Sequence, residues 1–285
     1  SVYGFIIVIS CFLQAMFGVV QFFGFFQIST TLWVTGSFDN PAGFAACLCA
    51  GFPFVGFLLS DSNKYIRYVG GLIGFVIVIA VILSQSRAGI MSIAFICFIL
   101  LNMKFFHKRW VKYLSLLCFA LLLSGCYWMK KDSADGRLLI WRCSVSMVKD
   151  APWLGHGIGS FEARYMDYQA DYFRQYGLNR YSMLADNVKH PFNEYLGVLL
   201  NFGFVGLLMI LALITLLIYC YKKHPCAEKR IAFCSLISIG VFSFFSYTFT
   251  YPFTWIVTFL CIIILTKEYI AKVFTCPIIK NTVCI

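Results

Sequence analysis

This sequence contains few charged side chains, and acidic ones are especially rare. Only 12% of its 285 residues are charged, and 12 are Asp or Glu, whereas about 25% of the residues of a soluble globular domain are charged. Apolar residues make up 61% of the chain. They form blocks of roughly 20 residues, the length that crosses a bilayer as an α-helix. These features exclude an ordinary soluble domain and predict an all-α polytopic membrane protein.

The sequence also lacks the motifs of several common functional sites. It has no HExxH, no Asp-x-Asp pair, no CxxC and no Cys/His spacing suited to a metal. We therefore expect no metal site and no cofactor. It has no GxxxxGK[ST] loop, which argues against ATP-driven transport. Most of the 13 cysteines lie inside apolar blocks, where a cysteine acts as a small apolar residue.

Lys and Arg residues predict how the chain crosses the membrane. Thirteen of them fall in the loops 60–68, 102–112 and 221–230 and in the tail, which lie on one side if eight spans alternate. The positive-inside rule makes that side the cytoplasm. The net charge of +11 therefore reflects topology, and no nucleic acid partner is expected. The expected spans are 3–26, 41–59, 69–84, 88–103, 112–129, 195–220, 231–249 and 253–271.

This topology divides the chain into three parts. Residues 1–129 hold five spans, 130–192 form a long external loop, and 193–285 hold three spans and a cytoplasmic tail. Within the loop, 136–149 and 161–176 are expected to be amphipathic helices, with Trp141 at the membrane interface. The chain opens at Ser1 almost directly in an apolar segment. We therefore expect that N-terminal helices precede it in a longer protein.

Three arginines are candidate anion-binding residues. Arg87 lies in a short polar turn between two apolar spans, where charge is costly and usually functional. Its planar guanidinium suits a phosphate or diphosphate, although an interfacial arginine that reaches lipid headgroups is the alternative. Arg137 and Arg142 lie on the 136–149 helix. Because they are five residues apart, they diverge by about 140° and are not expected to face one ligand.

His190 is a candidate general base, because it lies just before an apolar helix on the external side and titrates near neutral pH. A structural role is the alternative. Asn193 and Glu194 follow in the first helical turn, where they can cap the helix and interact with its dipole. His156, in a glycine-rich turn, is a rival candidate for the base.

Several short motifs, in this order, resemble those of the O-antigen ligase/polymerase superfamily. Their order along about residues 36–210, together with the long external loop, is more specific than any one of them. Many members of that family have a second histidine directly before the asparagine, where this chain has Phe192. The motifs are GSFDNP at 36–41, SRAG at 86–89, GRLLIW at 136–141, PWLGHGIGSF at 152–161, HPFNEYL at 190–196 and NFGFVGL at 201–207.

The resemblance implies a GT-C-like helical bundle with about eight transmembrane helices in this chain and one long periplasmic loop. It implies a metal-independent inverting glycosyltransferase of the bacterial inner membrane, which moves a glycan from an undecaprenyl-diphosphate carrier to an acceptor such as lipid A-core. O-antigen polymerase and protein O-oligosaccharyltransferase are alternatives within the family. A lipid-linked glycan flippase and a structural membrane subunit are alternatives from other classes.

The resemblance also assigns roles to residues of this chain. Arg87 and Arg137 match the arginines that hold the diphosphate, with Arg142 as a possible third. His190 matches the suggested base. Supporting roles are expected for His156, Trp141, Asn193 and Glu194.

Overall fold

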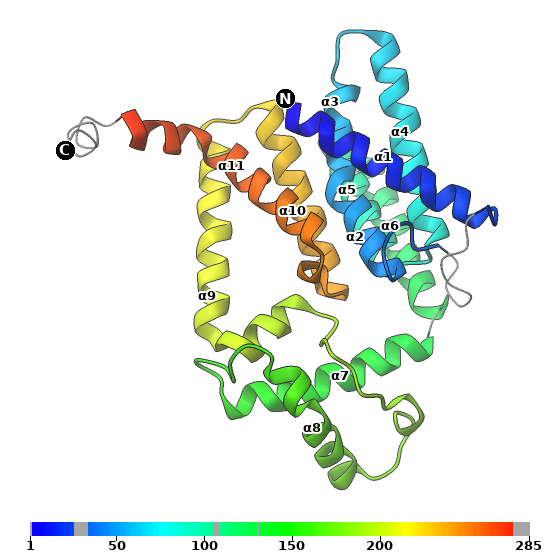
Figure 1. Cartoon of the computed structure of the whole chain (residues 1–285), viewed down its shortest axis with the longest axis vertical. Helices are drawn as coiled ribbons and strands as arrows, with labels where there is room; N and C mark the ends of the chain where they lie inside the picture. Colours follow the sequence, from blue (N-terminus) through cyan, green and yellow to red (C-terminus); the bar gives the residue numbers. More distant parts are fainter. Residues whose placement is uncertain (1, 26–33, 105–108, 130, 276–285) are drawn as a thin grey trace.

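The structure is a computed structural model that describes residues 2–25, 34–104, 109–129 and 131–275. Every regular element in these residues is a helix, so the chain is an all-α polytopic membrane protein (Figure 1). The helices are α1 (Val2–Phe22), α2 (Pro41–Gly51), η1 (Phe52–Val55), α3 (Gly56–Leu59), α4 (Lys64–Leu83), α5 (Arg87–Lys104), α6 (Arg109–Met129), α7 (Lys131–Asp150), α8 (Ser160–Tyr176), η2 (Ser182–Leu184), α9 (Glu194–Lys223), α10 (Ala227–Phe245), η3 (Thr248–Thr250) and α11 (Pro252–Thr275).

Each expected span coincides with a helix. Within the described residues, five helical segments are long and apolar enough to cross a membrane, namely α1, α2 with η1 and α3, α4, α9, and Pro252–Tyr269 of α11. Helix α5 is a shorter apolar helix, and α6 and α10 occupy the two remaining expected spans. The two amphipathic helices expected in the long loop are α7 and α8. Helix α7 begins five residues earlier than predicted, at Lys131.

Helix α10 lies at the centre of the bundle and packs against α2, α5, α9 and α11. Small residues of α2 let α10 approach closely, and serine hydroxyls then satisfy backbone carbonyls between helices. Ser238 Oγ donates to Cys49 O at 2.7 Å, and Ser235 Oγ donates to Ala50 O at 2.6 Å. Most of the cysteines whose side chains the structure describes are buried, in agreement with the prediction.

Helix α9 is broken at Gly203, whose φ of 61° and ψ of −158° are not helical. The break frees backbone groups, and the loop between α7 and α8 satisfies them. Phe204 N donates to Pro152 O at 2.8 Å and His156 N donates to Leu200 O at 2.7 Å. The loop therefore fixes the angle between the short first segment of α9 and its long second segment, visible in Figure 1.

Helices α7 and α8 form a second, smaller core around Leu139, Met147 and Tyr165. This unit lies at one end of the bundle, and the turn between α3 and α4 lies at the opposite end (Figure 1). The first segment of α9 packs against α7 and α8. As a result, residues just before and after Glu194 lie between the smaller core and the bundle.

Candidate functional site

The start of α9 is held in place by three side chains. Asn193 caps the helix, because its Oδ1 accepts from Leu196 N at 3.0 Å. Glu194 Oε1 accepts from Phe249 N at 2.8 Å and so links α9 to the connection between α10 and α11. Tyr195 OH donates to Gly240 O of α10 at 2.9 Å. The expected helix cap is therefore present. Glu194 lies in the first turn of α9, as expected, and it also accepts a hydrogen bond from the connection between α10 and α11.

His190 lies beside Tyr247, which follows the end of α10. The two rings stack with centroids 4.7 Å apart, and Phe192 meets Tyr247 edge-on at 5.3 Å. Burial of the ring lowers the pKa of His190 below its usual value, so the imidazole is neutral at pH 7. A neutral imidazole has the free lone pair that a general base requires.

A small pocket of about 180 Å³ opens beside His190. Its walls come from the segment before α9 and from the connection between α10 and α11, which are far apart in sequence. It is lined by His190, Pro191, Asn193, Glu194, Tyr247, Phe249 and Thr250. The pocket thus combines an imidazole, a carboxylate and hydroxyl groups, a set that suits a polyhydroxylated ligand.

Arg137 contacts residues next to those that line this pocket, and Arg87 is near enough to Arg137 for their charges to interact. Arg137 Nη1 donates to Phe245 O at 2.6 Å, and its guanidinium lies 5.0 Å from the centre of the Phe192 ring. Burial, with repulsion from Arg87 as a second cause, lowers the pKa of Arg137 to about 10. Arg87 Nη2 donates to Ser133 Oγ of α7 at 2.8 Å. A bound anion would relieve the repulsion between these two cations.

Trp141 connects α7 to the segment that carries His190. Its Nε1 donates to Pro191 O at 3.0 Å, and its ring meets Phe244 edge-on at 5.9 Å. The ring is only partly exposed. Trp141 therefore supports the peptide next to His190 from the α7 side.

Two candidate residues lie elsewhere. Arg142 faces α8 and η2, where its Nη1 donates to Tyr172 OH at 3.3 Å and its guanidinium lies 5.1 Å from the centre of the Tyr181 ring. His156 lies in the loop that joins α7 and α8, with Nε2 2.8 Å from Met147 O and Nδ1 3.2 Å from Arg164. The structure does not bring Arg142 or His156 to the His190 pocket.

The site also contains Tyr247, Asn40 and Tyr251, which the sequence did not single out. Asn40 caps α2 through Gly43 N at 2.8 Å, and its Nδ2 donates to Tyr247 OH at 3.5 Å. Tyr251 OH donates to Asn40 Oδ1 at 2.9 Å. The turn before α2 is thereby tied to the ring that stacks on His190. The only sequence signal was the place of Asn40 in the GSFDNP motif.

An apolar groove of about 580 Å³ runs between α5, α9 and α10. Tyr195, Phe244 and Phe245 lie at its end nearest α7, and Ile214 and Leu217 line it further along α9. Since the carbonyl of Phe245 accepts the hydrogen bond from Arg137, the groove ends next to the arginine pair. A long apolar chain with an anionic end matches this arrangement.

Metal ligands do not come together in the described residues, where no three His, Cys, Asp or Glu side chains are placed to hold an ion. A sequence search finds no matching curated protein. Residues 72–211, roughly half of the chain, match the model of the O-antigen ligase family. This segment begins within α4 and includes Arg87, Arg137 and His190. The chain therefore belongs, through this segment, to the O-antigen ligase/polymerase superfamily.

Proposed function

We propose that this protein is an O-antigen ligase-like inverting glycosyltransferase that moves a glycan from an undecaprenyl-diphosphate carrier to an acceptor hydroxyl. One observation carries the proposal: the neutral His190 lies in a polar pocket beside the Arg87–Arg137 pair. The pair in turn lies at the end of an apolar groove. A glycan, a diphosphate and a prenyl chain each have a chemically matching region, in the order in which the donor carries them.

The two arginines bind the diphosphate in this proposal. A guanidinium offers paired N–H donors to phosphate oxygens, and two of them offset much of the charge of a diphosphate. The departing diphosphate is a stable anion, so it requires electrostatic stabilisation rather than a general acid. Arg87 and Arg137 would supply that stabilisation without a metal.

His190 acts as the base. The oxygen of the acceptor hydroxyl attacks the anomeric carbon, and the bond from that carbon to the diphosphate oxygen breaks. The electron pair of the broken bond leaves with the diphosphate, and the hydroxyl proton moves to an imidazole nitrogen of His190. Attack opposite the leaving group inverts the anomeric configuration. Tyr247 and Trp141 hold the imidazole and its peptide in place.

The acceptor we favour is lipid A-core on the periplasmic side of the bacterial inner membrane. The positive-inside rule supports this side, because the loops rich in Lys and Arg lie at the opposite end of the bundle. A polymerase would use a second lipid-linked glycan as acceptor, and a protein O-oligosaccharyltransferase would use a hydroxyl side chain. The ligase, the polymerase and the protein O-oligosaccharyltransferase would all use the same donor site.

The test is the lipopolysaccharide profile of a strain that lacks the gene, complemented with wild type, His190→Ala, Arg87→Ala or Arg142→Gln. We expect the strains that carry His190→Ala or Arg87→Ala to insert the protein normally, to lose the O-antigen ladder and to accumulate lipid-linked glycan. Arg142→Gln is the matched control, because it lies away from the pocket, and should restore the ladder. Loss of long chains with one repeat retained on the core would indicate a polymerase instead. Normal transfer by both His190→Ala and Arg87→Ala would contradict the site and favour a flippase or a structural subunit.

A further inference from the structure

A second groove lies at the opposite end of the bundle from the His190 pocket. It has a volume of about 360 Å³ and lies between η1, α3, α4, α5 and α10. Its walls are largely apolar, with Phe52, Val55 and Phe75 among them. The polar side chains on it include Ser60, from the turn between α3 and α4, and Arg230, from the first turn of α10. Neither the proposed reaction nor the family match gives this groove a role.

The groove runs along α4, where it is lined from Gly70 to Val78. This stretch is about 12 Å long at about 1.5 Å per residue. Half of a hydrocarbon layer is about 15 Å thick. The lined stretch is therefore comparable to the part of one acyl chain that lies within one leaflet.

The glycines of α4 make room for such a chain. At Gly74, an added Cβ would lie 3.5 Å from Val55 Cγ1, which is ordinary contact. A larger side chain at this position would therefore be compatible with the helix packing but would extend into the groove. Glycine at this position keeps the space between α4 and η1 open.

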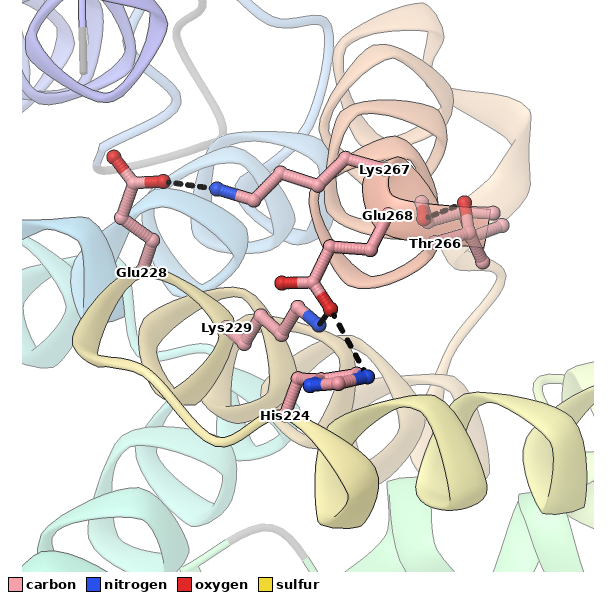
Figure 2. A network of polar contacts seen from close by, with 7 residues as sticks. His224, Glu228, Lys229, Thr266, Lys267 and Glu268 are labelled. Atoms are coloured by element: carbon pink, nitrogen blue, oxygen red, sulfur yellow. Dashed lines mark hydrogen bonds and ion pairs between the residues drawn. The ribbon is translucent and has the colours of Figure 1, made fainter. Parts of the chain in front are cut away.

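The rim of the groove carries Arg230, and Asp61 follows Ser60 in the α3–α4 turn, where it accepts from Asn63 N. At the same end, Lys229 lies 3.3 Å from Glu268, and Lys267 lies 3.0 Å from Glu228, as Figure 2 shows. Glu228 of α10 and Glu268 of α11 are thus already paired with lysines. Arg230 is exposed, and within the described residues its guanidinium has no hydrogen bond or ion pair.

From this arrangement we propose that the groove binds an anionic glycerophospholipid of the cytoplasmic leaflet, with one acyl chain against α4 and the phosphate on Arg230. Basic pockets between helices at the cytoplasmic face attract such headgroups. A helix is about 10 Å wide, whereas an extended acyl chain is much narrower, and the space that Gly74 leaves between α4 and η1 suits the narrower occupant. The proposal does not depend on the glycosyl transfer proposed above.

The test uses the full chain purified in detergent and stripped of lipid. Its thermal unfolding is measured against increasing phosphatidylglycerol, and against phosphatidylcholine with the same acyl chains. We expect a saturable rise in Tm that is larger for phosphatidylglycerol. Arg230→Gln should weaken phosphatidylglycerol binding roughly tenfold or more, the size expected for lost charge-assisted hydrogen bonds, and should abolish the preference between the two lipids.

Two further variants separate the groove from general effects of charge. Gly74→Leu should remove the saturable response to both lipids, because it fills the groove. Lys222→Gln is the matched control, an exposed cation at the same end that does not line the groove, and it should behave as wild type. If Gly74→Leu does not fold, the lipid response of Arg230→Gln alone tests the proposal, because Arg230 is exposed and its replacement costs little stability.

The proposal is overturned if phosphatidylglycerol gives no saturable shift, or if Arg230→Gln keeps the full preference. It is also overturned if a folded Gly74→Leu variant still responds. A response to an added prenyl diphosphate alone, lost in Gly74→Leu, would assign the groove to the glycan carrier and would contradict the proposal.

Discussion

The imidazole of His190 has a half-buried environment at the end of the bundle that carries α7 and α8. Burial is the main cause that lowers its pKa, Lys189 lowers it further, and Glu162 acts in the opposite direction. A base works only when neutral, so a lowered pKa keeps His190 active to lower pH than an exposed histidine would allow. We therefore expect the transfer rate to be constant between pH 7 and pH 8 and to fall only as the pH drops below 6.5. A pH profile of kcat/KM with a purified donor checks this, and an acid limb centred above 6.5 would contradict it.

A Tyr247→Leu variant tests whether the half-buried environment of His190 depends on the stacked ring of Tyr247. Replacing it with leucine removes the ring that stacks on His190 at 4.7 Å and the hydroxyl that Asn40 contacts. We expect kcat to fall at least tenfold and the acid limb to move toward higher pH, because His190 gains solvent. A purely structural role would lower the amount of folded protein and leave the pH profile unchanged.

Arg137 is expected to be sensitive even to a conservative change. Lysine keeps the charge but cannot reproduce the planar fork that reaches both Phe245 O and a phosphate. We expect Arg137→Lys to raise the KM for the lipid-linked donor roughly tenfold. Arg142→Lys is the control, since Arg142 contacts Tyr172 and Tyr181, and its KM should be unchanged. Equal effects of both changes would argue against the diphosphate role of Arg137.

Local sequence predicted part of this site. The five-residue spacing correctly separated the directions of Arg137 and Arg142, because helical geometry is set by neighbours in the chain. Asn193 was predicted as a helix cap for the same reason, and the structure places it there. Tyr247 was missed because its importance arises only when the end of α10 meets the segment before α9, and no local pattern encodes that meeting. The catalytic roles themselves stay predictions.

At the scale of elements, the broken helix α9 is the feature that a span prediction overlooked. Its apolar run contains Asn201 and three glycines, Gly197, Gly203 and Gly206, and isolated glycines in such a run are usually tolerated in a helix. The break is stabilised by the distant loop 151–159, which satisfies the freed backbone groups. The early start of α7 was also missed, although Asp132 in its first turn interacts favourably with the helix dipole.

Gly203 should therefore be intolerant of any side chain. An added Cβ would lie 2.3 Å from the carbonyl of Trp153, and the positive φ adds strain of about 1–3 kcal/mol. We expect Gly203→Ala to lower the Tm of the purified protein by several degrees. Gly71→Ala is the control, since its Cβ would meet nothing within 4 Å and its φ is not positive, and it should be neutral or slightly stabilising. Equal Tm values for the two variants would show that the break is not required.

Over the whole molecule, charge pairs join α9, α10 and α11 at the end opposite the site. Lys229 is fully buried and lies 3.3 Å from Glu268, which also lies 3.6 Å from His224 (Figure 2). Only Lys229 of this pair is fully buried, since Glu268 is 37% exposed, and loss of the carboxylate leaves the buried ammonium uncompensated. We expect Glu268→Gln to cost about 1–3 kcal/mol of stability.

The exposed pair nearby provides the comparison. Glu228→Gln breaks the contact with Lys267 and should cost less than about 1 kcal/mol. Unfolding by denaturant, or by heat in detergent, measures both variants. Similar losses would mean that Lys229 is solvated or finds another acceptor.

The sequence predicted the order and sidedness of the helices better than the contacts between them. The alternation of apolar blocks and basic loops placed the turn 36–41, Arg87 and the long loop on one side, and the structure brings Asn40, Arg87 and α7 to one end. The order of helices follows from hydropathy, which is a property of each segment. The central position of α10 depends on small residues and buried serines in α2, α5 and α10. The contacts of these residues join distant parts of the chain, so no single segment predicts them.

The break at Gly203 also determines which membranes suit this protein. An unbroken α9 of 30 residues would be about 45 Å long, far more than a hydrocarbon layer of about 30 Å. Residues 204–223 alone extend about 30 Å at 1.5 Å per residue. The first segment can then turn aside and keep Glu194 at the water boundary without tilting the bundle. The protein therefore matches a bilayer of ordinary thickness, and a sterol-thickened membrane would force its polar pocket toward the hydrocarbon.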